Sequence, residues 1–412
     1  MGSLLSDSKA PPSASWLLLG PAFVAAIAYV DPGNVAANVS AGAQYGFLLV
    51  WVILAANVMA GLVQYLSAKL GLVTGRSLPE SVADNTRTPT RIAYWLQAEL
   101  VAMATDLAEV VGGAIALYLL FDLPLLIGGV ITGAVSLLLL MVQNRRGQGV
   151  FERVITGLLL VIAIGFLTSL VVQPPSAADV ASGLIPRFDG PESILLATAM
   201  LGATVMPHAV YLHSGLARDR HGQPEEGAAR RRMLRITRYD VGIAMLVAGA
   251  VNLAMLLVAA TNLQGVENTD SIEGAYAAVR DALGPTVALF FAIGLLASGL
   301  ASTSVGAYAG AMIMQGLLRR TYPLLMRRLV TLIPALAILA IGVDPSRALV
   351  LSQVVLSFGI PFALVPLVRL TSNRSLMGDD VNHRVTTALG WTVAGVIIVL
   401  NVVLIYLTVK GS

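Results

Sequence analysis

The chain has 412 residues, of which 57% are hydrophobic and only 12% charged, and its mean hydropathy is +0.80. Soluble domains carry about twice that charged fraction, so a soluble enzyme is excluded and lipid must cover much of the surface. The net charge of +3 indicates no nucleic-acid partner, and the absence of cysteine excludes disulfides and cysteine-ligated metal sites.

Apolar runs of about 20 residues, long enough to cross a bilayer as helices, alternate with short polar segments along the whole chain. We predict eleven spanning helices, near residues 16–40, 46–70, 90–119, 124–143, 150–172, 191–215, 237–262, 284–317, 323–342, 346–370 and 386–409. The longest connections are the Pro/Ser-rich stretch 173–190 and the basic stretch 216–236. The short connections predict one transmembrane domain over residues 1–412, an all-α integral membrane fold without a separate soluble domain.

Lysine and arginine are distributed unevenly between the two sides of the membrane in this predicted topology. The N-terminus and every second connection after it hold 22 of the 26 basic residues. Cytoplasmic loops carry this excess, so we predict a cytoplasmic N-terminus and an extracellular or periplasmic C-terminus. The short loops and the lack of a targeting extension favour a bacterial plasma (inner) membrane.

Spans 1 and 6 share an interruption by proline, at Pro32 and at Pro207. Five spans separate their starts, so the two helices run in opposite directions through the bilayer. Broken helices at matching positions of oppositely oriented halves indicate the binding site of a transporter. Residues 16–172 and 191–370 would then be inverted repeats, with 386–409 as an additional helix. Proline also kinks purely structural helices, so the polar residues beside both breaks decide the interpretation.

Asp31 is the first carboxylate at membrane depth, where a charge costs at least about 2.5–3.5 kcal/mol. Pro32 and Gly33 unwind the helix after it and free backbone carbonyls, and Asn34 adds an amide oxygen. A carboxylate, an amide oxygen and free carbonyls form a ligand set for a desolvated cation. The alternative is a helix kink that Asp31 only caps.

Met206 supplies a different kind of ligand at the break of span 6. A thioether binds first-row transition metals but contributes little to Mg²⁺ or Ca²⁺. A methionine in a membrane helix is more often a packing residue. Its position beside Pro207 in the matching helix makes a ligand role as strong an interpretation as packing.

Span 3 carries three acids, Glu99, Asp106 and Glu109, which fall within about 80° of one another on a helix. Together with His208 they indicate a proton or ion path, because rows of acids and histidine form relays in membranes. A metal arriving at Asp31 would displace a proton toward His208, since imidazole titrates near neutrality. One or two of these acids, Asp106 among them, could instead be static partners of cytoplasmic-end arginines such as Arg327 or Arg328.

Three further polar residues lie in spans. Asp240 is close to the end of its span, and we expect its side chain to reach solvent at the membrane interface. His213 is near the inside end of span 6 and is expected to be an ordinary interface residue. Gln353 in span 10 either completes a coordination shell or bonds a neighbouring backbone group, and the residues alone do not choose between the two.

These motifs resemble those of the Nramp family. The resemblance rests on Asp31-Pro32-Gly33-Asn34, on Met206-Pro207-His208 and on Thr105-Asp106-Leu107-Ala108-Glu109, and it extends over the whole chain. It implies a LeuT-type fold of five plus five inverted repeats with one extra helix, in which helices 1 and 6 are discontinuous. It also implies proton-coupled import of divalent transition metals.

The resemblance further implies a set of ligands and a proton route. The metal ligands would be Asp31, Asn34, Met206, the carbonyls of Ala28 and Ala203, and, in some conformations, Gln353. The proton route would include Asp31, His208, Glu109 and Asp106, to which we add Glu99 from the helix face. The implied cargo is Mn²⁺ and Fe²⁺, with Cd²⁺ and Co²⁺ as further ions and H⁺ as the coupling ion. We expect no prosthetic group and no obligatory protein partner besides the lipid bilayer.

Other classes of function remain open from the residues alone. One is an ion-coupled carrier of amino acids or other small solutes on the same fold, although Asp31 would repel a substrate carboxylate. Another is a passive cation channel, since acidic rings also select cations. An intramembrane metalloenzyme is disfavoured, because no His-Glu-x-x-His stretch occurs.

Overall fold

The computed structural model describes residues 20–146, 148–266, 269, 271–320 and 324–410, and within these ranges every regular element is a helix. The spanning segments are α1 (Pro21–Ile27), the 3-10 helix η2 (Ala28–Val30), α2 (Pro32–Tyr45), α3 (Val50–Thr74), α5 (Thr88–Phe121), α6 (Leu125–Arg146), α7 (Gln148–Val172), α9 (Gly190–Thr204), α10 (Pro207–His221), α11 (Ala228–Asn262), α13 (Pro285–Leu318), α14 (Leu324–Ile341), α15 (Pro345–Thr371) and α17 (Arg384–Lys410). Shorter helices lie between them, namely α4 (Leu78–Asp84), α8 (Ala177–Ser182), α12 (Ile272–Leu283), α16 (Arg374–Met377) and η3 (Gly378–Asp380).

The eleven predicted spans are each represented by helices of the described residues. Eight helical segments are long and apolar enough to cross a bilayer, with α9 and α10 counted together. Two shorter apolar segments, Pro21–Val30 and Leu125–Met141, belong to predicted spans 1 and 4. The predicted interruptions of spans 1 and 6 are also confirmed, as α1–η2–α2 and as α9–α10.

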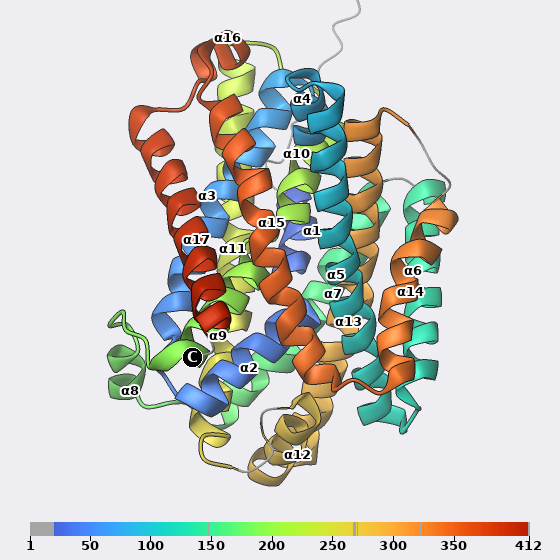
Figure 1. The fold of residues 1–412 in the computed structure, drawn as a ribbon, viewed down its shortest axis with the longest axis vertical. Helices are drawn as coiled ribbons and strands as arrows, with labels where there is room; N and C mark the ends of the chain where they lie inside the picture. The colour runs from blue at the N-terminus through green and yellow to red at the C-terminus, as the bar shows by residue number, and fades with distance from the viewer. Residues whose placement is uncertain (1–19, 147, 267–268, 270, 321–323, 411–412) are drawn as a thin grey trace, which may run out of the picture.

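The two interrupted spans run in opposite directions. In Figure 1, α1 lies above α2, whereas α9 lies below α10. The short helices α4 and α16 lie at the upper end of the bundle, and α8 and α12 lie at the lower end. We call the upper end the basic end, because the connections there carry most of the lysine and arginine. This arrangement is the one expected for inverted repeats.

The interrupted span 6 lies at the centre of the bundle. In its most apolar window 89% of the residues are buried within the protein, compared with 33% for α17 at the periphery. Helices such as α17 leave apolar side chains on the outside, as a surface covered by lipid requires. The polar residues beside the break of α9 and α10, such as Thr204 and His208, are therefore removed from both water and lipid.

The basic stretch 216–236 is mostly helical, unlike the connection that its charge indicates. The helix α10 continues to His221 and α11 already begins at Ala228, so only residues 222–227 connect them. Arginine is a good helix former, and positive charge near the C-terminus of α10 interacts favourably with the helix dipole. The arginines therefore mark the end of the membrane-spanning part of each helix, although the helix itself continues.

Candidate functional site

The two breaks have the same local construction. In span 1 the backbone turns extended at Asp31, with φ −70° and ψ 167°, and α2 begins at Pro32. In span 6 it turns extended at Met206, with φ −67° and ψ 124°, and α10 begins at Pro207. A proline ring suits the first turn of a helix and disfavours a helical residue before it. The sequence therefore places each break one residue before its proline.

Each proline also frees one backbone carbonyl. In a continuous helix the carbonyl of Ala28 would accept the N–H of residue 32, and that of Ala203 the N–H of residue 207. Both later residues are prolines and have no N–H to donate. These are the two carbonyls that the family resemblance names as ligands, so spacing from proline is a local signal for them.

The two breaks are joined by Asn34. Its side-chain Nδ2 donates to Asp31 Oδ1 at 2.8 Å and to the Ala203 carbonyl at 2.9 Å, across 169 residues of sequence. Asp31 Oδ1 also accepts the Asn34 backbone N–H at 2.8 Å, so Asp31 does cap α2. The oxygen Asn34 Oδ1 is buried and has no hydrogen-bond partner among the described residues. Capping thus leaves a free oxygen at the point where the breaks meet.

Gln353 approaches the same point from α15. Its Nε2 donates to Asp31 Oδ2 at 3.3 Å and to Ser352 Oγ at 3.3 Å. Its Oε1 is a second buried oxygen without a hydrogen-bond partner in the described part of the chain. The Gln353 amide therefore bonds two side chains, Asp31 and Ser352, and its place in a coordination shell stays a prediction. Met206 is fully buried at the facing break.

Gly33 makes the approach of Gln353 to Asp31 sterically possible. A Cβ atom at Gly33 would lie 1.6 Å from Gln353 Nε2, so any side chain there must displace the amide. We expect Gly33→Ala to lower the free energy of unfolding by about 1–3 kcal/mol, as other overpacked sites do, and to weaken metal binding.

Gly61→Ala is the matched control, because its Cβ would meet only Met245 Cγ at 3.7 Å. Thermal unfolding and Mn²⁺ titration of both variants in detergent would test this. Equal behaviour of the two variants would show that Gln353 does not depend on Gly33.

The three acids of α5 have different surroundings. Asp106 forms a fully buried ion pair with Arg328, which also donates to Thr303 Oγ1. Glu99 pairs with Arg327 at 3.4 Å. Glu109 is completely buried, and neither of its carboxylate oxygens has a hydrogen-bond partner among the described residues. Asp106 and Glu99 therefore each have an arginine partner, whereas Glu109 has no ion pair among the described residues.

His208 lies beside α5, with its Nδ1 3.4 Å from Thr105 Oγ1. Thr105 Oγ1 donates a hydrogen bond to the Val101 carbonyl at 3.0 Å, so it accepts the hydrogen bond from His208 Nδ1–H. The other ring nitrogen, Nε2, is then the basic one, and it is buried without a partner among the described residues. An unprotonated nitrogen of this kind can receive a proton.

The prediction that His213 is an interface residue was wrong. Its side chain is fully buried, and its Nδ1 lies 2.6 Å from Gln64 Oε1. Gln64 Nε2 in turn donates to the Tyr29 hydroxyl, within the break of span 1. Sequence reasoning assigned no role to Gln64 or Tyr29, although both are polar residues inside apolar spans.

The prediction that Asp240 reaches solvent was also wrong. The residue is 3% exposed, and its carboxylate accepts hydrogen bonds from the backbone N–H groups of Gly20 at 3.1 Å and Ala22 at 3.0 Å. The first N–H groups of a helix have no intrahelical acceptor, and a negative charge there interacts favourably with the dipole. Asp240 therefore caps α1 from another helix, a role that only the tertiary structure reveals.

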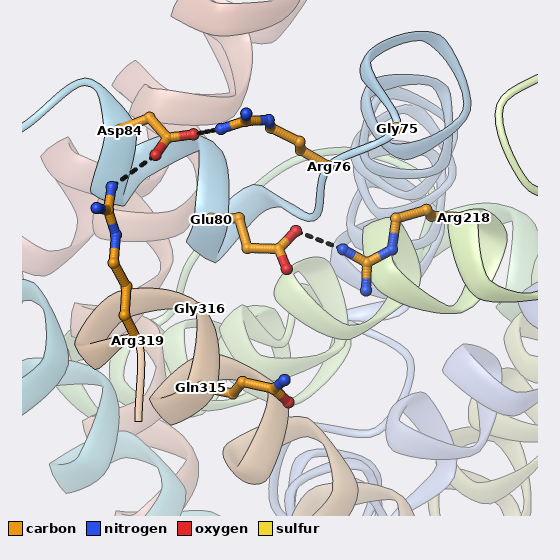
Figure 2. Close-up of a pocket in the computed structure, with 8 residues that line it drawn as sticks. All are labelled: Gly75, Arg76, Glu80, Asp84, Arg218, Gln315, Gly316 and Arg319. Carbon is orange, nitrogen blue, oxygen red and sulfur yellow. Dashed lines mark hydrogen bonds and ion pairs between the residues drawn. The ribbon is translucent and has the colours of Figure 1, made fainter. Parts of the chain in front are cut away.

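A network of ion pairs lies at the basic end of the bundle. Figure 2 shows Asp84 between Arg76 and Arg319, with Arg319 Nη2 2.7 Å from Asp84, and Glu80 paired with Arg218. They line a cavity of about 470 Å³. The pairs attach the short helix α4 to the ends of α10 and α13, so the end of α10 is held in place.

Comparisons with known proteins identify the family that has this architecture and these motifs. Residues 22–407 match the family model described as natural resistance-associated macrophage protein-like, or Nramp. The divalent metal cation transporter MntH of Mycobacterium tuberculosis is 69% identical over 411 residues, which are all of this chain and 96% of that protein. MntH of Deinococcus radiodurans is 46% identical over 414 residues, covering all of this chain and 94% of that protein.

Solved structures agree with the sequence comparisons. The manganese transporter of Eremococcus coleocola superposes with a TM-score of 0.85 at 31% identity, over 96% of this chain and 88% of that one. A nucleobase-cation symporter superposes with a TM-score of 0.61 at 16% identity, over 94% and 90% of the two chains, which shows a shared fold alone. This chain belongs to the Nramp family and has its LeuT-type fold.

Proposed function

We propose that this chain imports Mn²⁺ and Fe²⁺ through the membrane by alternating access, with proton entry as the driving reaction. Curated relatives at up to 69% identity are divalent metal cation transporters, and a similar structure is that of a manganese transporter. The metal ion is a transported substrate, so the chain acts as a carrier and not as an enzyme.

One observation carries the assignment of the metal site. Two buried amide oxygens, Asn34 Oδ1 and Gln353 Oε1, flank the Asp31 carboxylate and have no hydrogen-bond partner among the described residues. A buried polar oxygen without a partner is costly, so a ligand that uses it is expected. The Asp31 charge and the carbonyls of Ala28 and Ala203 would complete an oxygen-rich site for a cation.

Met206 supports a transition metal over Ca²⁺ or Mg²⁺. Its backbone is extended at the break, beside the carbonyl-bearing end of α9, and its side chain is removed from water. A thioether adds affinity for a soft or borderline ion and almost none for a hard one. Cd²⁺ and Co²⁺ satisfy the same chemistry and would be transported as well.

The proton route proposed here begins at Asp31 and passes through His208, Glu109, Asp106 and Glu99. His208 offers a basic Nε2, and Glu109 is a buried acid with unoccupied oxygens. Asp106 and Glu99 lead from there toward Arg328 and Arg327 on α14. Binding of a divalent cation at Asp31 favours loss of its proton, and the nearest free base would receive it.

Orientation and domain structure are proposed from charge and length. The basic end would face the cytoplasm of a bacterial cell, because cytoplasmic loops carry most lysine and arginine. The C-terminus would then lie on the outer side of the plasma membrane. The chain forms one transmembrane domain, with repeats over about 16–172 and 191–370 and an additional helix at 386–409.

Uptake by proteoliposomes tests the function directly. Purified protein is reconstituted with a pH dye inside, and Mn²⁺ is added outside at several external pH values. We expect Mn²⁺ uptake together with internal acidification, and both should increase as the external pH falls. Uptake of Mn²⁺ without any entry of protons would reject the symport.

Met206→Ala should change ion selectivity more than Mn²⁺ transport itself. Met206 is the one soft ligand in the proposed set, so its loss removes the preference of the site for binding Mn²⁺ over Ca²⁺. We therefore expect the ratio of Mn²⁺ to Ca²⁺ uptake to fall about tenfold. Met200→Ala is the matched control, because Met200 is an equally buried methionine on α9 away from the break. Identical selectivity of the two variants would make Met206 a packing residue.

A further inference from the structure

The first turns of α11 carry arginines on two different faces. Arg230 points inward, is nearly buried, and pairs with Glu226 at 3.2 Å and with Asp380 at 3.4 Å. Arg231, Arg235 and Arg238 are exposed, and none of the three forms an ion pair within the described residues. Internal ion pairing therefore explains Arg230 and leaves Arg231, Arg235 and Arg238 without a partner of opposite charge among the described residues.

The three exposed arginines lie on one face of α11. Their spacing of four and three residues places them within about 60° around the helix axis and about 10 Å along it. The exposed side of the helix continues into its apolar part at Leu246, which is 71% exposed and lies within about 80° of all three arginines around the axis. Apolar side chains this exposed in a spanning helix face lipid. The arginines consequently stand in the layer just beyond the acyl chains.

Arg238 is held at the boundary of this layer by α3. Its guanidinium lies 5.1 Å from the centre of the Tyr65 ring, and its Nη2 is 3.5 Å from the Tyr65 hydroxyl. Tyr239, 64% exposed, follows directly. Tyrosine is enriched at the membrane interface, where its ring meets acyl chains and its hydroxyl meets head groups. Two tyrosines beside the last arginine place that arginine at the level of the head groups.

We propose that this face of α11, formed by Arg231, Arg235 and Arg238 with Tyr65 and Tyr239, binds the phosphate of an anionic phospholipid. A headgroup phosphate supplies the negative charge that the described residues do not provide, and the acyl chains of the lipid would lie along Leu246. Basic clusters immediately beyond the end of a spanning helix bind anionic lipids in this way. Under the proposed orientation the lipid belongs to the inner leaflet, but the site does not depend on metal transport.

Lipid binding by purified protein tests the proposal. Phosphatidylglycerol and phosphatidylcholine are titrated into the detergent-solubilised protein, and bound lipid is counted by native mass spectrometry. We expect the wild type to prefer phosphatidylglycerol, and Arg231→Gln/Arg235→Gln/Arg238→Gln to lose at least about tenfold of that preference. The matched control, Arg153→Gln/Arg374→Gln/Arg384→Gln, removes three exposed arginines of the same end from three other elements. It should keep the preference within about twofold.

Several outcomes would overturn the proposal. One is a wild type that binds phosphatidylglycerol no better than phosphatidylcholine, and another is an equal loss of preference in both triple variants. A third is displacement of the lipid by millimolar inorganic phosphate, which would indicate a site for a soluble anion. All variants should bind Mn²⁺ like the wild type, which checks their folding. If the first triple variant misfolds, Arg231→Gln alone is decisive, with an expected loss of about fivefold, because Arg231 has no ion pair among the described residues to lose.

Discussion

Asp31→Asn should reduce Mn²⁺ affinity at least about a hundredfold, because it removes the one negative charge among the proposed ligands. Asparagine keeps the size of the side chain and is as good an N-cap as aspartate, so the bond to the Asn34 backbone N–H can persist. The protein should therefore remain folded, and removing a buried charge should not lower its melting temperature. Isothermal titration with Mn²⁺, together with a thermal melt, measures both quantities.

Asp240→Asn is the matched control for this substitution. Asp240 is also a buried carboxylate that caps a helix of the interrupted span 1, but it acts at the start of α1 instead of at the break. We expect its variant to bind Mn²⁺ within about threefold of the wild type. Retained affinity in Asp31→Asn, or an equal loss in both variants, would place the metal elsewhere.

Arg328→Met should be the most destabilising single change outside the metal site. Arg328 is 1% exposed, and its loss leaves the carboxylate of Asp106 buried without its partner. Removing one member of a buried ion pair typically costs about 3–5 kcal/mol in the free energy of unfolding. Unfolding by sodium dodecyl sulfate from mixed micelles would measure the loss.

The double variant Asp106→Asn/Arg328→Met separates charge from packing. With both charges gone neither member of the pair is left buried without its partner, and replacing a whole buried pair is often nearly neutral. We expect the double variant to recover most of the stability that Arg328→Met loses. A double variant as unstable as the single one would mean that Arg328 contributes mainly through packing or through Thr303.

Much of the fold could be predicted from the sequence because the bilayer restricts the alternatives. A spanning segment must satisfy its backbone internally, so apolar length alone indicates helices. The interruptions could also be predicted, since Pro32 and Pro207 each lack the backbone N–H that would continue the helical hydrogen bonding. The ends of helices were harder to predict, because the arginines of 216–236 lie beyond the membrane-spanning parts of α10 and α11 although both helices continue through them.

Polar residues near the ends of spans were the main failures. Asp240 and His213 could equally face water, lipid or protein according to their position along a helix. Their burial depends on which helices pack around them. Asp240 contacts the start of α1, and His213 contacts Gln64 on α3. Sequence distance gives no information about these neighbours, because the partners are more than 140 residues away.

The sequence by itself determined the two prolines, the unwound backbone beside them, and the chemical character of Asp31, Asn34, Met206 and His208. These follow from bond chemistry that acts over a few residues. Only the tertiary structure decided that Asn34 bonds groups of both breaks and that Gln353 contacts Asp31. It also decided that Arg328 pairs with Asp106, while Glu109 has no hydrogen-bond partner among the described residues. Those facts depend on the packing of distant helices, which fixes the positions at which side-chain atoms meet.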